Sequence, residues 1–189
     1  MDNSQIINET LTVLRNGGVI LYPTDTVWGI GCDATNEEAV AKVFKIKKRE
    51  DSKSLVLLAS DLDMVARYVK AIPSIAIDLV EVNDAPMTII YPDAQGIAPN
   101  ATAEDGSVGI RIPMNDFCKK LVRKLRHPLV STSANISGEP TPKRFKDICL
   151  EIKDAVDFIV PPLMEADSTG KASQIIKVGL KGEVEIIRA

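Results

Sequence analysis

The sequence predicts an α/β fold, a single domain built on a twisted, open, mixed sheet that is flanked by helices. Three observations predict it. Segments with helical periodicity alternate with short apolar segments along the 189 residues. The run at 55–59, Leu-Val-Leu-Leu-Ala, is apolar at every position, as in a strand that is covered on both faces. No internal repeat or low-complexity linker divides the chain, so we expect one domain over residues 1–189.

The elements of the first half follow from apolar periodicity and end signals. Ile7, Leu11 and Leu14 share one face of a helix expected at 4–16, which Gly17-Gly18 ends, and a buried strand follows at 19–22. Asn36, with Glu37 after it, is an N-terminal signal for a helix that continues to about residue 48. The same signals predict a strand at 55–59, helices at 61–69 and 73–82, and strands at 87–91 and 108–112. The loop at 92–106 is rich in Pro, Ala and Gly and long enough to predict a mobile lid.

The second half continues the alternation. A helix expected at 116–126 leads into a strand at 128–130. Thr141-Pro142 predicts the start of another helix, with Thr as the cap and Pro in the first helical position. Strands are expected at 156–160, 174–178 and 183–188.

Composition excludes several classes of protein. A net charge of −3 argues against a strong polyanion binder, and 4% aromatic residues argue against a stacking platform for single-stranded nucleic acid. No apolar run has the length of a membrane span, and the N-terminus lacks the features of a secretory signal. Cys32, Cys118 and Cys149 are isolated and odd in number, so we expect reduced thiols, a cytoplasmic protein and no membrane partner.

Missing motifs narrow the mechanism further. The chain has no P-loop and no Gly-x-Gly-x-x-Gly after its first strand. His127, the sole histidine, precedes Pro128 at an expected helix-to-strand joint and is interpreted as structural. A serine or cysteine nucleophile activated by histidine is therefore not expected, and no His/Cys cluster predicts a protein-held metal site. Catalysis in such a chain relies on placing charges and hydrogen-bond donors around a reacting phosphate.

Basic residues occur in three groups. The second and third groups are interpreted as solvated helix faces. The first extends from a helix end into a loop, where cations can converge on a phosphate. The groups are Lys42, Lys45, Lys47, Lys48, Arg49 and Lys53; Lys119, Lys120, Arg123, Lys124 and Arg126; and Lys143, Arg144 and Lys146.

Three further segments carry candidate polar groups. The run Ser131-Thr132-Ser133-Ala134-Asn135-Ile136-Ser137-Gly138 forms either an elaborate turn, the commoner outcome for such residues, or the wall of a polar pocket. Pro23-Thr24-Asp25-Thr26 lies at the exit of the first strand, where an ordinary turn with Asp25 capping backbone amides is the simpler interpretation. Arg111 alternates with Ile110 and Ile112, so it is either a solvent-facing cation or a cavity-floor residue that pairs with a carboxylate.

Taken together, these segments resemble the YrdC family of threonylcarbamoyl-AMP synthases over nearly the whole chain. The resemblance rests on the order and spacing of Tyr22-Pro23-Thr24-Asp25-Thr26-Val27-Trp28-Gly29-Ile30-Gly31, Lys47-Lys48-Arg49 and the run 131–138. Pro86-Met87-Thr88, the strand 108–113 and the end at Ile186-Ile187-Arg188 add to it. The resemblance implies an open sheet curled around a large concave cavity.

The resemblance also implies a reaction: L-threonine, bicarbonate or CO2, and ATP give threonylcarbamoyl-AMP and pyrophosphate, with Mg2+ arriving on the ATP. A tRNA-modifying threonylcarbamoyl transferase then uses the product. It assigns catalytic roles to Lys47 and Arg49. It assigns ATP binding to Arg49, Lys53, Ser133, Asn135 and Arg188, and threonine binding to Thr26, Arg111, Ser131 and Ser173.

Two departures and two alternatives accompany this reading. Trp28 stands where many family members have Tyr, and Ala172-Ser173-Gln174 replaces a Pro-Ser-Thr sequence. One alternative is the sister branch typified by YciO, which departs from the signature Ser133-Ala134-Asn135 found here. The other is a module that binds tRNA or double-stranded RNA through its basic groups, since duplex RNA is recognised by shape and phosphate contacts.

Overall fold

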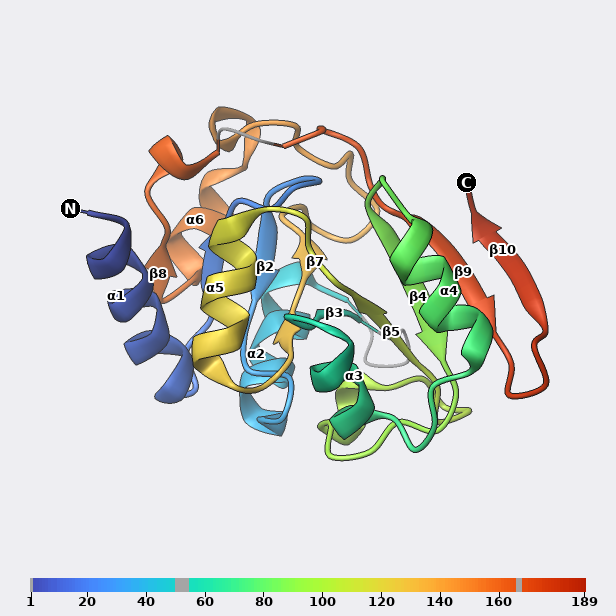
Figure 1. The fold of residues 1–189 in the computed structure, drawn as a ribbon. Coiled ribbons are helices and arrows are strands. Elements are labelled where there is room, and N and C mark those ends of the chain that lie inside the picture. Colours follow the sequence, from blue (N-terminus) through green and yellow to red (C-terminus); the bar gives the residue numbers. More distant parts are fainter. Residues whose placement is uncertain (1, 50–54, 166–167) are drawn as a thin grey trace.

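The structure, a computed structural model, describes residues 2–49, 55–165 and 168–189 (Figure 1). Its helices and 3-10 turns are α1 Asn3–Arg15, α2 Glu37–Lys47, α3 Leu62–Tyr68, α4 Ser74–Val82, η1 Pro99–Ala101, α5 Asp116–Leu125, η2 Phe145–Asp147, α6 Leu150–Ala155 and η3 Pro162–Met164. Its strands are β1 Ile20–Tyr22, β2 Gly29–Gly31, β3 Val56–Leu58, β4 Met87–Tyr91, β5 Val108–Arg111, β6 Leu129–Val130, β7 Thr132–Ser133, β8 Phe158–Ile159, β9 Gln174–Val178 and β10 Val184–Arg188.

The strands form two mixed sheets. One has the order β7-β2-β1-β8 and the other the order β10-β9-β4-β5-β3-β6. Each contains parallel and antiparallel pairs: β1 is antiparallel to β2 and parallel to β8, and β5 is parallel to β3 and antiparallel to β4. The predicted α/β class with a mixed sheet is confirmed, and the hydrogen bonding divides that sheet in two.

The segment 129–133 joins the two sheets. Its first half, β6, pairs with β3 in the six-stranded sheet, and its second half, β7, pairs with β2 in the four-stranded sheet. The Val130 amide also donates to the Cys32 carbonyl at 2.8 Å. A β-bridge between Asp33 and Leu129 lies next to that bond. The polar run that follows Val130 is therefore held between the sheets.

Helices pack against the outer faces of the sheets. Helix α1 packs on α5 and β1, and α4 lies against β4, where Val80 is close to Ile89 and Tyr91 (Figure 1). Because side chains alternate along β4, Ile89 and Tyr91 face α4, and Thr88 and Ile90 face the opposite side. The opposite side is where the cavity described below opens.

Asp and Asn residues begin four of the helices, as the sequence predicts for Asn36 and Asp61. Asp2, Asn36, Asp61 and Asn115 each accept a backbone N–H of the first turn, at 2.8 to 3.2 Å. Apolar faces of these helices then pack on the strands in one buried cluster, which includes Leu14. Among the described residues, no helix is both long enough and apolar enough to cross a membrane.

Most predicted elements are confirmed to within one or two residues at their ends. Strands β2 and β7 were not predicted. The helix expected to begin at Thr141-Pro142 is wrong, because the described chain there makes no regular turn until η2, and α6 begins at Leu150.

The loop at 92–106, for which the sequence raised the possibility of a lid, is packed and hydrogen-bonded in this structure. Ala98 and Ala101 are buried, and the Ala98 amide donates to the Ala34 carbonyl at 2.9 Å. No residue of the loop lines the large cavity.

Candidate functional site

A cavity of about 320 Å3 opens between the two sheets. Residues 26–29 and 131–133 form one wall, and side chains of β4, β5, β9 and β10 form the other. Seven of the predicted site residues line this cavity: Thr26, Arg49, Arg111, Ser131, Ser133, Ser173 and Arg188. The interpretation of the 131–138 run as a pocket wall is confirmed for its first half.

The strand register explains how distant residues meet on the cavity floor. Arg111 pairs with Thr88, Thr88 with Ile175, and Ile175 with Arg188, so these four residues form a row across β5, β4, β9 and β10. Gly109 lies in the next row, where an added Cβ would come 3.3 Å from Thr88 Cγ2. The cavity floor therefore carries an arginine at each end of this row. Beside Thr88, Gly109 contributes no side chain to the floor.

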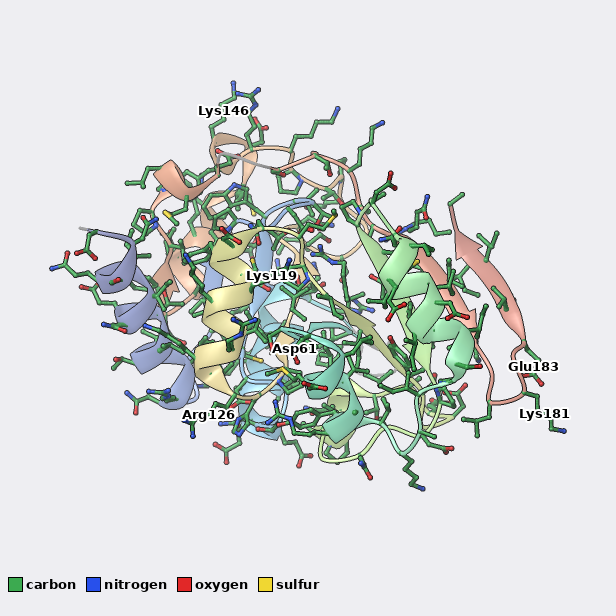
Figure 2. All side chains as sticks on the ribbon, in the orientation of Figure 1. Asp61, Lys119, Arg126, Lys146, Lys181 and Glu183 are labelled. Carbon is green, nitrogen blue, oxygen red and sulfur yellow. The ribbon has the colours of Figure 1, made fainter. Side chains whose placement is uncertain are left out.

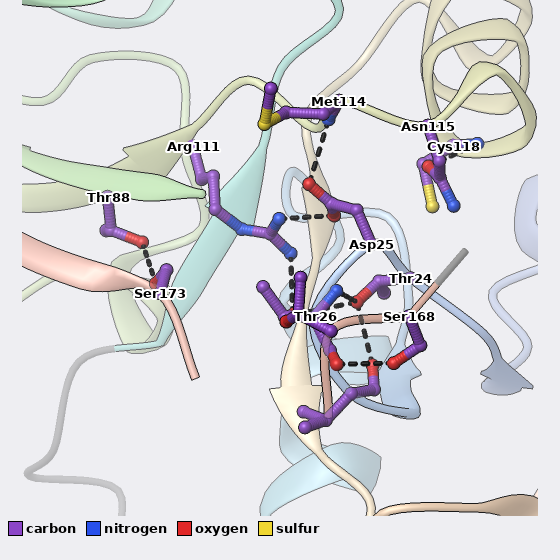
Figure 3. Close-up of polar contacts among 12 residues, drawn as sticks. Thr24, Asp25, Thr26, Thr88, Arg111, Met114, Asn115, Cys118, Ser168 and Ser173 are labelled. Carbon is purple, nitrogen blue, oxygen red and sulfur yellow. Dashed lines mark hydrogen bonds and ion pairs between the residues drawn. The ribbon is translucent and has the colours of Figure 1, made fainter. Parts of the chain in front are cut away.

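Arg111 lies on this floor with 3% of its surface exposed, so the solvent-facing interpretation is wrong. Its Nη1 forms a buried ion pair with Asp25 Oδ1, and its Nη2 donates to Thr26 Oγ1 at 3.3 Å (Figure 3). The other Asp25 oxygen accepts the Met114 amide at 2.9 Å. Asp25 was expected to cap backbone amides in a turn; its principal partner is a cation 86 residues away.

Thr26 belongs to a hydrogen-bond chain with a defined direction. Thr24 Oγ1 donates its single proton to the Val27 carbonyl at 2.7 Å. The 2.9 Å contact between the Thr24 and Thr26 hydroxyls must therefore use the proton of Thr26. Since Thr26 also accepts from Arg111, its remaining group on the cavity side is an oxygen lone pair. At this position the site presents an acceptor to a bound ligand.

Ser173 and Arg188 support each other at the opposite end of the floor. Arg188 donates from Nε and Nη2 to the Ser173 carbonyl at 2.9 and 2.7 Å. The Ser173 hydroxyl contacts the Thr88 hydroxyl at 2.8 Å (Figure 3). The terminal arginine is thereby held over β9 with its guanidinium on the cavity.

The three consecutive cations after α2 occupy three different environments. Lys47 is buried and donates from Nζ to the carbonyls of Ser133 and Asn135, at 2.5 and 2.7 Å. Lys48 adopts a left-handed conformation (φ 50°) and pairs on the outside with Glu151 at 2.7 Å. Arg49 lines the cavity, and its guanidinium lies 6.0 Å from the Phe44 ring centre.

Charge and burial affect the basic residues of this segment differently. Burial, together with the neighbouring Arg49, lowers the pKa of Lys47 to about 8. Burial also lowers the pKa of Arg49, but a guanidinium keeps its charge in proteins. Lys53, which the sequence assigns to ATP, lies outside the described residues.

The structure does not bring Lys47 or Asn135 to the cavity lining. The Asn135 amide nitrogen donates to the carbonyls of Ile136 and Glu139, at 3.0 and 2.8 Å, and so closes its own turn. Lys47 grips the backbone of the same segment from behind. Both residues shape the wall that carries Ser133.

Trp28 forms part of the cavity wall, as predicted. Its ring is buried and lies 5.0 Å from the Phe145 ring. The indole N–H donates to Glu165 Oε1 at 2.9 Å, and the same oxygen accepts the Phe145 amide at 3.1 Å. The Glu165 carboxylate thus links the cavity wall to η2. A tyrosine in place of Trp28 has no indole N–H and would not make this hydrogen bond in the same way.

Residues that the sequence reasoning did not assign also lie at the site. Thr88 and Thr141 line the cavity, and Asp25 holds Arg111 from behind. The strand predicted at 87–91 could have indicated Thr88 as a cavity residue. Side chains alternate along a strand, so Thr88 faces the side opposite to buried Ile89. Thr141 was interpreted as a helix cap, and its position depends on a loop path that no local pattern specifies.

His127 and the remaining basic groups lie elsewhere. His127 Nδ1 contacts Asp33 Oδ2 at 2.7 Å at the joint between α5 and β6, in agreement with a structural role. Lys119 lies on α5 and Arg126 at its C-terminal end, whereas Lys146 lies in η2 (Figure 2), and none of the three lines the large cavity. Within the described ranges, no acidic side chain lines the cavity and no cluster of His, Cys, Asp or Glu could hold a metal ion.

The arrangement suits a ligand that carries several negative charges. Three arginines and a set of hydroxyls converge on one cavity. Arginines bind carboxylate and phosphate oxygens through paired donors, and hydroxyls complete their hydrogen bonding.

Comparison with known proteins agrees with these features. The family model for Sua5, YciO and YrdC proteins, described as "Telomere recombination", matches residues 12–189. A protein of Coxiella burnetii (strain RSA 493 / Nine Mile phase I) named threonylcarbamoyl-AMP synthase is 34% identical over 160 residues, which cover 84% of this chain and 86% of that protein.

Solved structures show the same fold. P. abyssi Sua5 complexed with L-threonine superposes with a TM-score of 0.83 at 24% identity, over 94% of this chain; this chain spans 52% of that protein's length. E. coli YciO superposes with a TM-score of 0.79 at 22% identity, over 97% of this chain and 88% of that one. The match of the family model over almost the whole sequence, on a cavity built from the expected segments, shows that the chain belongs to the Sua5/YciO/YrdC family.

Proposed function

We propose that the protein is an L-threonylcarbamoyladenylate synthase, a nucleotidyltransferase that makes threonylcarbamoyl-AMP and pyrophosphate from L-threonine, bicarbonate or CO2, and ATP. The observation that carries the proposal is the convergence of Arg49, Arg111 and Arg188 with seven hydroxyl side chains, among the described residues, on one cavity between the sheets. The names of the relatives and the L-threonine in the Sua5 crystals support the same reaction.

The chemistry needs little covalent help from the protein. The amine nitrogen of threonine bonds to CO2 and releases a proton, which gives a carbamate. A carbamate oxygen then bonds to the α-phosphorus of ATP, the bond to the bridging oxygen breaks, and pyrophosphate leaves with Mg2+. Because the nucleophile is already an anion, positioning and charge stabilisation are the main requirements.

The threonine end of the cavity is assigned to the Arg111 side. Arg111 pairs with the carboxylate of threonine, and the Thr26 lone pair accepts a proton of its amine or hydroxyl group. Ser131 and Ser173 line the same space and supply hydroxyl groups for further contacts.

The nucleotide end is assigned to Arg49, Arg188 and Ser133. Arg49 stabilises the charge that develops at the α-phosphate, with Lys53 as a further cation from the same segment. Lys47 and Asn135 act on this end through the backbone that carries Ser133. The phosphate oxygens of ATP would hold the Mg2+ that arrives with the nucleotide, and the ion would neutralise part of the charge on the pyrophosphate leaving group.

The product is a labile mixed anhydride, so a threonylcarbamoyl transferase that modifies adenosine in tRNA must consume it. The three cysteines are free thiols, which supports a reducing, cytoplasmic location for both steps. Direct binding of tRNA or double-stranded RNA by the basic groups is the separate possibility that the test below distinguishes.

The test is pyrophosphate release from Mg-ATP and bicarbonate with and without L-threonine, with L-serine as the comparison. We expect threonine-dependent release that Arg49→Ala abolishes and that Lys181→Ala, an exposed cation at the β9–β10 turn, leaves unchanged (Figure 2). Equal release with and without threonine, or none at all from folded protein, contradicts the proposal. In that case retention of RNA on the protein as a function of salt separates a binding module from a YciO-type relative.

A further inference from the structure

The buried pair of Asp25 and Arg111 contains the strongest feature that the proposed roles leave unexplained. Asp25 is 4% exposed and does not line the cavity, yet both its oxygens are engaged. Oδ1 binds Arg111, and Oδ2 accepts the amide of Met114, which follows the same strand by three residues. A loop of the four-stranded sheet is thereby fixed to the end of β5 (Figure 3).

These contacts define the plane of the guanidinium. Asp25 holds Nη1 and Thr26 holds Nη2, so rotation about the Nε–Cζ bond would break both contacts. A guanidinium has five N–H groups, and these contacts to described residues use two of them. The rest of the fork lies on the cavity floor, where the flat geometry of the group matches a carboxylate.

The pair also sets the local charge. A buried arginine without an acidic partner would attract any anion, including the phosphates of ATP. The pair of Asp25 and Arg111 has little net charge, so its attraction for an anion depends on hydrogen-bond geometry. Arg188 lines the same cavity, and among the described residues no salt bridge joins it to a carboxylate.

We propose that Asp25 is a positioning residue for the amino-acid substrate: it orients the Arg111 guanidinium toward a carboxylate and keeps phosphate from competing for it. The inference rests on the proposed function for the identity of the carboxylate, which is that of L-threonine. It does not require Asp25 to touch either substrate.

The first test is calorimetric binding of L-threonine and of ATP to wild-type protein and to Asp25→Asn. The asparagine keeps an oxygen for the Met114 amide and places an NH2 group against Arg111. We expect the dissociation constant for threonine to rise roughly 10- to 100-fold, as for loss of a charge-assisted hydrogen bond. The constant for ATP should stay the same or fall, because phosphate gains access to Arg111. Asp63→Asn, the same change at an exposed site on α3, serves as the matched control.

The sign of the effect separates positioning from simple competition. If Asp25 only competed with the substrate for Arg111, Asp25→Asn would bind threonine more tightly, and that result overturns the proposal. A structural role alone predicts weaker binding of both ligands to the same degree, and that result overturns it as well. In a double-mutant cycle with Arg111→Gln, the Asp25→Asn effect on threonine binding should disappear.

The second test needs neither ligand nor variant. In wild-type protein, the two Nη nitrogens of Arg111 should give separate NMR signals, because rotation of a guanidinium held at both Nη atoms is slow. A single averaged signal overturns the proposal even if Asp25→Asn does not fold. If wild-type protein fails to bind threonine but shows separate signals, the proposed function fails, and the positioning role stands for another carboxylate ligand.

Discussion

At the scale of single residues, the direction of the Thr26 hydrogen bonds has a measurable consequence. Thr26→Val removes the acceptor that faces the cavity and leaves one Arg111 donor without its partner. We expect kcat/KM for threonine to fall by about 1–3 kcal/mol in free energy, the cost of a lost hydrogen bond that leaves a buried group unpaired. Pyrophosphate release as a function of threonine concentration measures it.

Thr26→Ser is the control for that change. It keeps the hydroxyl that donates to Thr24 and accepts from Arg111, so its kcat/KM should remain close to the wild-type value. If valine and serine at this position gave the same activity, the hydroxyl would have no part in threonine recognition.

A second consequence at this scale concerns Lys47 and pH. Burial and Arg49 lower its pKa to about 8, against about 10.4 in an unfolded chain. Below pH 8 both states hold the proton. Between about pH 8 and 10 the unfolded state holds more protons, so this group makes the free energy of unfolding rise with pH. Lys47→Met lacks that contribution.

Urea unfolding of the two proteins at pH 7.5 and 9.5 measures this effect. The difference in unfolding free energy, wild type minus Lys47→Met, should become more positive by about 1–2 kcal/mol at the higher pH. Other titrating groups are shared by both proteins and cancel in the difference. Identical pH dependence of the two proteins would mean that the ammonium keeps its proton throughout, held by the Ser133 and Asn135 carbonyls.

The sequence predicted which residues line the cavity better than it predicted which groups form ion pairs and hydrogen bonds with them. Arg111, Ser131, Ser133 and Ser173 were all expected at the site, because their residue types and order carry the family pattern. Asp25 was not, because its partner is 86 residues away and the pairing depends on how two sheets meet. A lysine that follows a helix pattern likewise gives no local sign that it turns inward to bind carbonyls, as Lys47 does.

At the scale of elements, the loop at 92–106 should behave as part of the rigid body. Its amides at Ala94 and Ala98 donate to the carbonyls of Gly106 and Ala34 at 2.9 Å, and Asn100 Nδ2 donates to the Glu37 carbonyl at 3.0 Å. We expect slow amide hydrogen exchange at Ala94 and Ala98 in the free protein, with no further slowing when ATP and threonine are added. Exchange that slowed only with substrates would restore the lid.

The elements that the sequence missed are short and depend on distant partners. β2 is a three-residue strand with glycine at both ends, and β7 has two residues. Both strands are too short for an alternation of apolar and polar residues to be recognised in the sequence. Helices with an Asn or Asp cap and a long apolar face were predicted well, because both signals are local. The Thr141-Pro142 signal failed although Phe145, Ile148 and Ile152 have helical spacing, because the chain forms only the short η2 turn there before α6 begins at Leu150.

At the scale of the whole molecule, burial divides the three thiols into two classes. Cys32 and Cys118 are fully buried, and burial raises the pKa of both, that of Cys118 to about 12. Cys149 is exposed. A thiolate is the reactive form, so a disulfide reagent should modify one thiol per native chain and three after denaturation.

Cys149→Ser provides the control for the thiol count, because the native variant should then show no rapid reaction. Rapid modification of two or more thiols in native wild-type protein would mean that the packing around β2 or α5, where Cys32 and Cys118 lie, opens readily.

The pairing of the two sheets also bears on how the chain is made. β1 pairs with β8, β2 with β7, β3 with β6 and β4 with β9, so strands from the first half depend on partners from the second. During synthesis, the first hundred or so residues therefore emerge with open strand edges that nothing yet covers. The contacts that build the cavity are the same long-range ones, which slow folding. A ribosome-bound chain that stops before residue 129 should recruit chaperones strongly and lose them once the segment that joins the sheets has emerged.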